Sequence, residues 1–395
     1  MPSDVRKGSA LPKDCKNFWG YAPGCARPME DLRGAAPKHA GAFRKVKDLP
    51  HIRRRSRDLL PAAFCLVLAA FCMLAAPTAS ASSWTKQRTS SLAWLHAVYF
   101  LDQDRGWAVG SHGALLVTKD SGKTWRAKPQ PTEDVIRDLY FADESNGWLL
   151  CERNVYELKS NDEQRAYLMK TVDGGEHWQR VNLRGANVDA RLLRALFSRG
   201  GRGWAFGEGG ALYTTRDSGA NWIKLQAPTR YLLLGGDFID ENIGWLVGAG
   251  ATILQTSDGG ETWHRGQLQT TNKIRFNAVS FVDVRRGWAV GSAGAIYRTI
   301  NGGRSWQAQA SGVTTELLDV KFLDAAEGWA VGAEGTLLHT SDGGMHWTSE
   351  PSVTPHALER IFFTDRSHGW AVGFGGTIIS YNASSSRAEA PRLRR

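Results

Sequence analysis

Cysteine is scarce in this sequence, and its placement excludes a disulfide-stabilised or zinc-binding fold. The 395 residues contain 5 cysteines. Cys15 and Cys25 are near the start, Cys65 and Cys72 lie in an apolar run, and Cys151 alone falls in the rest of the chain. One thiol cannot form an internal disulfide, and no cluster of cysteine and histidine has the spacing of a metal site. Packing must therefore hold the fold together, and we expect neither a metal nor a cofactor.

The central part of the chain also lacks an excess of charge, although the whole chain has a net charge of +10. Residues 1–81 hold 14 Lys/Arg against 6 Asp/Glu, and residues 387–395 hold 4 against 1. The segment between them, 82–386, contains 31 basic and 32 acidic side chains. Because the basic excess is confined to the two ends, composition gives no argument for nucleic-acid binding, and we expect none.

A long hydrophobic run occurs once, within residues 51–81, which have the pattern of an export signal. A group of arginines precedes the apolar stretch Leu59–Ala76, and small residues follow up to Ala81. Cleavage after Ala81 would export the mature domain, to the periplasm of a bacterial host. An uncleaved membrane anchor is the alternative, since the 18 apolar residues approach the length of about 20 that spans a bilayer.

The two outer segments show no hydrophobic periodicity. Residues 1–50 are rich in Pro, Gly, Lys and Arg, and we expect a disordered extension or a start codon assigned too far upstream. Residues 387–395 are interpreted as a disordered basic tail.

Tryptophan, by contrast, is abundant and regularly spaced. Of 16 tryptophans, seven follow a glycine, at intervals of 41, 56, 41, 43, 41 and 41 residues. A period near forty, with short apolar runs between Gly- and Asp-rich turns, is typical of a β-propeller, whose repeating unit is one small antiparallel sheet. The sequence therefore predicts an all-β fold, a seven-bladed β-propeller of four-stranded antiparallel blades over residues 82–386.

Six further tryptophans end a turn motif, Ser/Thr-x-Asp-x-Gly-x-x-Trp, which resembles the Asp-box of bacterial neuraminidase-type repeat proteins. Its third position is occupied by Asp120, Asp173, Asp217, Asp258, Asn301 and Asp342. We expect this side chain to accept backbone N–H bonds across its own turn, the glycine to adopt positive φ, and the tryptophan to pack between blades. Asn301 keeps the acceptor oxygen without the charge, which favours a structural role over the alternatives of catalysis or calcium binding.

Seven Gly-Trp strands but only six complete turn motifs leave the last unit without a fourth strand. The segment Ser83–Lys86 contains a tryptophan 41 residues before Trp125, at the repeat distance. We therefore predict that residues 83–90 complete the seventh blade and close the ring, which removes exposed sheet edges.

One unit departs from the pattern. Trp178 follows Trp148 by 30 positions instead of the usual 18, and the additional residues fall in about 152–164. This insertion is interpreted either as a site of specific contact or as an elongated, solvated hairpin.

The Gly-Trp-Ala-Val-Gly strands, the six turn motifs and the seven units together resemble the photosystem II assembly and stability factor family, over about residues 83–381. The resemblance implies a propeller in the thylakoid lumen or its bacterial equivalent. It also implies a non-catalytic role, in which the protein binds a membrane-protein assembly intermediate partly through an arginine patch, and we expect the mature protein to be a monomer.

Candidate residues for such a patch come from the strands themselves. The apolar run before each Gly-Trp pair should be the innermost strand, and these runs bring Arg137, Arg194, Arg275 and Arg360 toward the channel. Guanidinium groups there could bind a carboxylate or an acidic peptide. The alternative is that neighbouring acids such as Asp138, Asp319 and Glu359 neutralise them.

Two other functions remain open at this stage. A glycoside hydrolase of the neuraminidase type would need an arginine cluster, a tyrosine nucleophile with its glutamate, and an acid. Four tyrosines, Tyr99, Tyr140, Tyr213 and Tyr297, occupy repeated strand positions, which favours packing. An accessory protein of an envelope transporter differs from an assembly factor only in its partner, and the sequence does not separate the two.

Overall fold

The computed structural model describes one propeller domain and leaves the two ends of the chain outside the description. The described residues are 83–383 except 155, 157, 159–163, 182, 184–189, 199 and 269–272. The predicted extension, export signal and basic tail, and much of the 152–164 insertion, lie outside them. No helix within the described ranges combines the length and apolar composition needed to cross a membrane.

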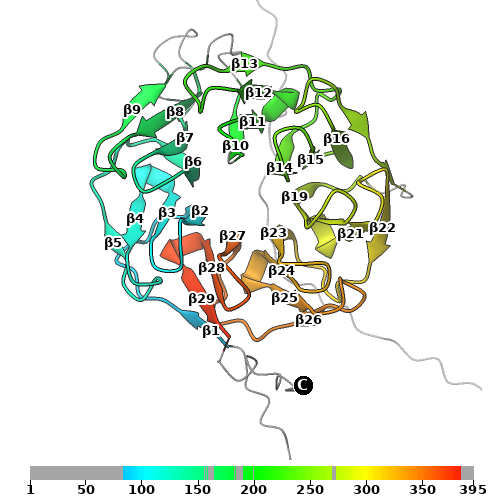
Figure 1. Ribbon diagram of the computed structural model, residues 1–395. Coiled ribbons are helices and arrows are strands. Elements are labelled where there is room, and N and C mark those ends of the chain that lie inside the picture. Colours follow the sequence, from blue (N-terminus) through cyan, green and yellow to red (C-terminus); the bar gives the residue numbers. More distant parts are fainter. Residues whose placement is uncertain are drawn as a thin grey trace, which may run out of the picture. The chain divides into compact units, whose positions relative to one another are not determined.

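Seven antiparallel sheets surround a central axis, one for each Gly-Trp unit (Figure 1). The innermost strands are β2 (Leu95–Phe100), β6 (Val135–Phe141), β10 (Leu192–Phe197), β14 (Leu233–Phe238), β19 (Phe276–Phe281), β23 (Leu317–Phe322) and β27 (Leu358–Phe363). The second strands, which contain the Gly-Trp pairs, are β3 (Gly106–Gly110), β7 (Gly147–Glu152), β11 (Gly203–Gly207), β15 (Gly244–Gly248), β20 (Gly287–Gly291), β24 (Gly328–Gly332) and β28 (His368–Gly373). The predicted all-β, seven-bladed propeller is confirmed.

The outer half of each blade is shorter. The third strands are β4 (Leu115–Thr118), β8 (Ala166–Thr171), β12 (Leu212–Thr215), β16 (Thr252–Thr256), β21 (Ile296–Thr299), β25 (Leu337–Thr340) and β29 (Ile378–Asn382). The outermost strands are β5 (Arg126–Ala127), β9 (Gln179–Val181), β13 (Ile223–Lys224), β17 (His264–Arg265), β22 (Ser305–Gln309), β26 (Thr348–Ser349) and β1 (Ser83–Lys86). One sheet has five strands instead of four, because β18 (Gln267–Leu268) pairs in parallel with β22.

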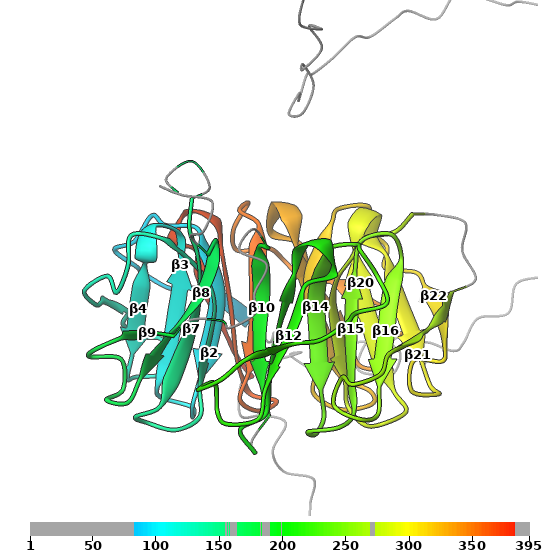
Figure 2. The same ribbon diagram turned by 90° about the horizontal axis from the view of Figure 1, so that it is seen from above.

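The ring has two distinct faces. Second and third strands are joined on one face, here called the turn face, in five blades by three-residue 3-10 turns that appear as coiled ribbons along one edge in Figure 2. These turns are η1 (Ser111–Gly113), η3 (Glu208–Gly210), η4 (Ser292–Gly294), η5 (Ala333–Gly335) and η6 (Phe374–Gly376). The opposite face, here called the loop face, carries the loops between first and second strands and the six turn motifs. Inner strands therefore begin at the turn face and end at the loop face.

Ring closure follows the prediction. Strand β1 pairs antiparallel with β29, with Trp84 opposite Tyr381 (Figure 1). The last blade is thus completed by residues from the other end of the domain, and its sheet has no free outer edge at β29.

A repeated aromatic contact joins each blade to the next. The Gly-Trp indole of one blade lies against the phenylalanine that ends the inner strand of the following blade, stacked as Trp245 is on Phe281 at 3.4 Å between ring centroids, or tilted as Trp148 is on Phe197. The turn-motif tryptophan of that blade meets the same phenylalanine edge-on, as Trp306 does at 5.8 Å. In the last blade Trp84 makes this edge contact with Phe363 at 6.0 Å. Trp84 therefore occupies the place of the missing seventh motif tryptophan.

The turn motifs make the hydrogen bonds expected of them. Asp258 Oδ1 accepts the backbone N–H of Thr262 at 2.9 Å, and Asn301 Oδ1 accepts that of Ser305 at 3.0 Å. The motif glycine Gly260 has a φ of 98°, and the residue before it, Gly259, also has positive φ. This turn also accepts a hydrogen bond from the preceding blade, since Trp204 Nε1 donates to the carbonyl of Gly259 at 2.9 Å. The motif thus fixes both its own turn and the interface between blades.

Candidate functional site

The seven inner strands line a channel with a cavity of about 380 Å³. Three carboxylates in it accept backbone N–H groups of the following blade. Asp138 bonds Ala195 at 3.1 Å, Asp237 bonds Phe281 at 2.7 Å and Asp319 bonds Ile361 at 3.0 Å. These acids therefore connect neighbouring inner strands, which have no sheet hydrogen bonds to each other.

Two of the predicted arginines lie beside these acids. Arg194 in β10 donates from Nε to Asp138 at 2.9 Å, and Arg360 in β27 has its Nη1 3.9 Å from Asp319. Burial raises the pKa of Asp319 to about 6, against the opposing charge of Arg194 and its backbone hydrogen bonds. Both arginines thus have the neutralising partners that the sequence suggested as the alternative to ligand binding.

Arg137 belongs to a different cluster, at the mouth of the channel on the turn face. Its Nε donates to Glu152 at 2.6 Å, and Arg191 lies 2.8 Å from the same carboxylate. Arg165, at the end of the insertion, is a third guanidinium at 3.4 Å, and it lies equally close to a second carboxylate, that of the exposed Glu208. Glu152 ends β7 and is buried, so three cations converge on one enclosed anion. We call Arg137, Arg165 and Arg191 with Glu152 the basic mouth.

The electrostatics of the basic mouth follow from the close approach of its guanidinium groups. Burial, together with the charges of Arg137 and Arg191, lowers the pKa of the neighbouring His96 to about 3, so this imidazole is neutral at physiological pH. Burial also lowers the pKa of Arg137, and the nearby Arg191 acts in the same direction while Glu152 opposes it. A carboxylate from a partner would relieve the repulsion between Arg137 and Arg191 and find guanidinium donors in place.

On the other side of the channel mouth, acidic side chains accompany the arginine. Arg275, which directly precedes β19, bonds Glu316, and that carboxylate also accepts from Asn277 at 2.7 Å. Glu359 in β27 accepts the indole N–H of Trp94 at 2.9 Å. The four predicted arginines therefore do not form one patch, because two lie inside the channel and two on different sides of its mouth.

Sequence reasoning missed Arg191 as a site residue. It lies just before an inner strand, and its partner Glu152 is 39 residues earlier, in another blade. The available signal was the insertion, since Glu152 and Arg165 flank it, and the basic mouth is built where that blade departs from the repeat.

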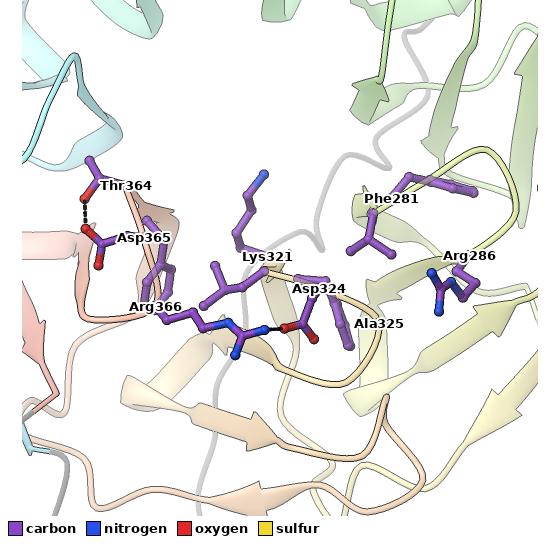
Figure 3. Close-up of a pocket in the computed structure, with 12 residues that line it drawn as sticks. Phe281, Arg286, Lys321, Asp324, Ala325, Thr364, Asp365 and Arg366 are labelled. Carbon is purple, nitrogen blue, oxygen red and sulfur yellow. Dashed lines mark hydrogen bonds and ion pairs between the residues drawn. The ribbon is translucent and has the colours of Figure 1, made fainter. Parts of the chain in front are cut away.

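The loop face carries a separate hollow of about 590 Å³ over the ends of β19, β23 and β27 (Figure 3). Arg366 reaches across to bond Asp324, and Lys321 projects from the end of β23 (Figure 3). Asp365 accepts from the N–H of Ser367 at 2.6 Å, so its carboxylate serves its own turn. Its lining also contains Arg286, so basic side chains outnumber acidic ones in this hollow.

The described residues show no metal-binding group, and the four repeated tyrosines lie in the blades or along the channel. Within the ranges given above, no group of three His, Cys, Asp or Glu side chains is placed to hold a metal ion. Tyr213 and Tyr297 are buried in the blades, and the Tyr99 hydroxyl donates to the carbonyl of Phe141 at 2.8 Å. Tyr213 and Tyr297 therefore have the burial of packing residues, whereas Tyr99 and Tyr140 also line the channel cavity.

Comparison with known proteins decides the family. The model of the family described as photosynthesis system II assembly factor YCF48 matches residues 129–231, 222–310 and 308–382, which is more than half of the chain. The chain belongs to this family. The resemblance drawn from the Gly-Trp strands and turn motifs is thereby confirmed.

Two curated relatives of the YCF48 family match parts of the chain. Photosystem II assembly lipoprotein Ycf48 of Synechococcus sp. (strain CC9902) is 29% identical over 37% of this chain and 41% of its own length. Photosystem II stability/assembly factor HCF136, chloroplastic, of Arabidopsis thaliana is 27% identical over 31% of this chain and 28% of its own. The matched part of the chain thus spans less than half of either relative.

Solved structures share the fold. A structure described as YCF48 bound to D1 peptide has a TM-score of 0.64 at 21% identity and covers 78% of this chain and 97% of its own. YCF48 from Cyanidioschyzon merolae has a TM-score of 0.63 at 20% identity, covering 76% and 99%. The xyloglucanase from Xanthomonas campestris, at 14% identity, has a TM-score of 0.60 and covers 78% and 55%. At these identities the likeness concerns the fold alone.

Proposed function

We propose that this YCF48-family protein is an exported, non-enzymatic scaffold that binds a subunit of photosystem II during assembly of the complex. The observation that carries the proposal is the basic mouth, where three arginines surround one buried glutamate. Membership of the family supports the choice of partner, as does a relative whose structure is described with a bound D1 peptide. Export is supported by the signal-like residues 51–81 and by relatives named as a lipoprotein and a chloroplast protein.

The binding chemistry we propose is capture of a carboxylate from the partner. Guanidinium groups bind carboxylates through paired N–H donors, and partial burial strengthens the interaction by lowering the local dielectric. Glu152 holds the three arginines in place before the partner arrives, so little side-chain entropy is lost on binding. Arg194 and Arg360, deeper in the channel, would act on a segment that enters it.

The test is capture of the partner in the source organism. The full chain carries an affinity tag and is crosslinked mildly, and membrane proteins recovered with it are identified by mass spectrometry. We expect a photosystem II subunit with the natural chain and its loss with the double variant Arg137→Gln, Arg191→Gln. The control is Arg216→Gln, which removes an exposed ion pair with Glu261 elsewhere on the ring.

Each other outcome contradicts the proposal in a definite way. Recovery of an envelope transporter subunit would favour the accessory role. Equal recovery with the double variant would show that the basic mouth does not bind the partner. If no partner is recovered, the protein is not a scaffold of this kind.

A further inference from the structure

Three large apolar side chains are exposed together on the turn face. Leu92 is 88% exposed, Trp94 41% and Phe374 50%. The rings of Trp94 and Phe374 meet edge-on at 5.5 Å, and a hollow of about 590 Å³ opens beside them. We call Leu92, Trp94 and Phe374 the apolar shelf. Clustered exposed aromatic residues with a polar rim mark a binding surface more often than single exposed ones do.

Two residues of the apolar shelf, Trp94 and Phe374, are anchored by hydrogen bonds. Trp94 Nε1 donates to Glu359, and the backbone N–H of Trp94 donates to the hydroxyl of Ser111 at 3.0 Å. The backbone N–H of Phe374 donates to the carbonyl of Ala357 at 3.0 Å, at the start of η6. A partner that covers these rings therefore gains apolar burial without having to order them first.

The apolar shelf adjoins the basic mouth. The ring of His96 lies 5.4 Å from that of Trp94, and the same His96 is buried beside the charges of Arg137 and Arg191. Glu359, which positions Trp94, is also close enough to Arg137 for the two charges to attract. Guanidinium groups and exposed aromatic rings thus share one mouth.

This combination specifies the partner segment. We propose that the segment bound at the basic mouth is an extended peptide in which a large apolar side chain lies within a few residues of the captured carboxylate, and that this side chain packs on the apolar shelf. The inference rests on the proposed function, because the carboxylate sets the register of the peptide. An extended chain advances about 3.3 Å per residue, so a short segment spans the step from the basic mouth to the shelf.

Other occupants fit less well. A stable dimer buries about 800 Å² on each copy, whereas the shelf is three side chains bordered by the polar Ser111, His112 and Gln130. A neutral lipid or apolar surface would leave the neighbouring guanidinium groups without the anion that they attract. The charge beside the shelf therefore favours an acidic, amphipathic peptide.

The test measures binding of fluorescein-labelled synthetic peptides of about ten residues to the full chain by fluorescence polarisation. The reference peptide has one Phe two residues from a Glu and an amidated C-terminus. Companions replace Phe by Ala, replace Glu by Gln, or move the carboxylate to a free C-terminus, which separates the two sources of the anion. Burial of one phenyl ring predicts a loss of about tenfold or more in affinity from Phe to Ala.

Variants separate the two halves of the surface. In Phe374→Ala and Leu92→Ser the ratio between Phe and Ala peptides should fall to about twofold, while the preference for Glu over Gln remains. In Arg191→Gln the preference for Glu should fall while the Phe-to-Ala ratio remains. Tyr231→Ala, at another exposed aromatic residue of the turn face, is the control and should change neither ratio.

The outcomes distinguish the two proposals. If the carboxylate peptides bind but Phe gives no advantage, or the advantage survives Phe374→Ala, the shelf inference is wrong and the proposed function stands. If no carboxylate peptide binds, both the proposed function and the inference that rests on it are wrong. A dimer dissociated by Phe374→Ala in analytical ultracentrifugation, or vesicle binding lost in it, would overturn the inference in favour of a second copy or a lipid surface.

Discussion

The third side chain of the turn motif accepts a backbone hydrogen bond, and one copy of the motif shows whether its charge matters, because Asn301 replaces the aspartate there. Asp258 accepts from the N–H and the hydroxyl of Thr262, and although burial acts against it, these bonds lower the pKa of Asp258 to about 2. Asn301 does the same backbone task without a charge. The acceptor oxygen, and not the negative charge, is therefore what the turn requires.

The first prediction concerns this acceptor. Asp258→Ala should lower the free energy of unfolding by about 1–3 kcal/mol, because the N–H of Thr262 loses its partner. Asp258→Asn should cost less, since Asn301 already fills the same position. Urea denaturation followed by tryptophan fluorescence measures both, and an equal cost for the two variants would show that the charge itself is needed.

The second prediction concerns Asp319 and pH. Because burial raises the pKa of Asp319 to about 6, the folded state binds an extra proton between the unfolded pKa of about 4 and pH 6. Stability from this group is therefore present at low pH and decreases as pH rises through that window. Asp319→Asn should flatten the dependence of the unfolding free energy on pH between 4 and 6. If the slope of unfolding free energy against pH is unchanged in this variant, the extra proton of the folded state is bound by another group.

The roles of individual residues could be predicted from the sequence where the same residue recurs at the same position of several repeats. The motif oxygen, the motif glycine and the two tryptophans were predictable because six or seven copies repeat one environment. The partners of the arginines were not, since Arg194 pairs with Asp138 and Arg191 with Glu152 across a blade boundary whose register only the folded ring sets.

At the scale of the element, strand β1 is the most informative. It is only four residues long, yet it pairs with β29 and places Trp84 against Phe363 and Trp329 in the last blade interface. Its existence followed from counting motifs against Gly-Trp strands. The extra strand β18 had no such signal, because two residues paired in parallel carry no repeat pattern.

The third prediction concerns ring closure. Trp84→Ala should lower the free energy of unfolding by about 3–5 kcal/mol, as for other buried aromatic residues, because it leaves a cavity between the last two blades. Trp94→Ala is the matched control and should cost much less, since Trp94 is partly exposed. Similar melting temperatures for the two variants would contradict the closure of the ring by β1.

At the scale of the whole molecule, the ring has one distinctive mouth. The turn face combines the basic mouth with the apolar shelf, whereas the hollow on the loop face pairs Arg366 with Asp324. The sequence predicted the ring and arginines near its axis, but not which face would carry the site. That depended on residues from blades one, two, three and seven meeting at one opening, which spacing along the chain does not reveal.

The central claim, that the partner binds at the turn face, is tested most directly by site-specific photo-crosslinking. A benzophenone amino acid replaces Gln130, which is exposed beside the apolar shelf, or Val284, which is exposed on the loop face. The account predicts that irradiation in the source organism joins a photosystem II subunit to the Gln130 probe and not to the Val284 probe, and that Arg191→Gln abolishes the product. A partner joined equally well, or only, through Val284 would contradict it.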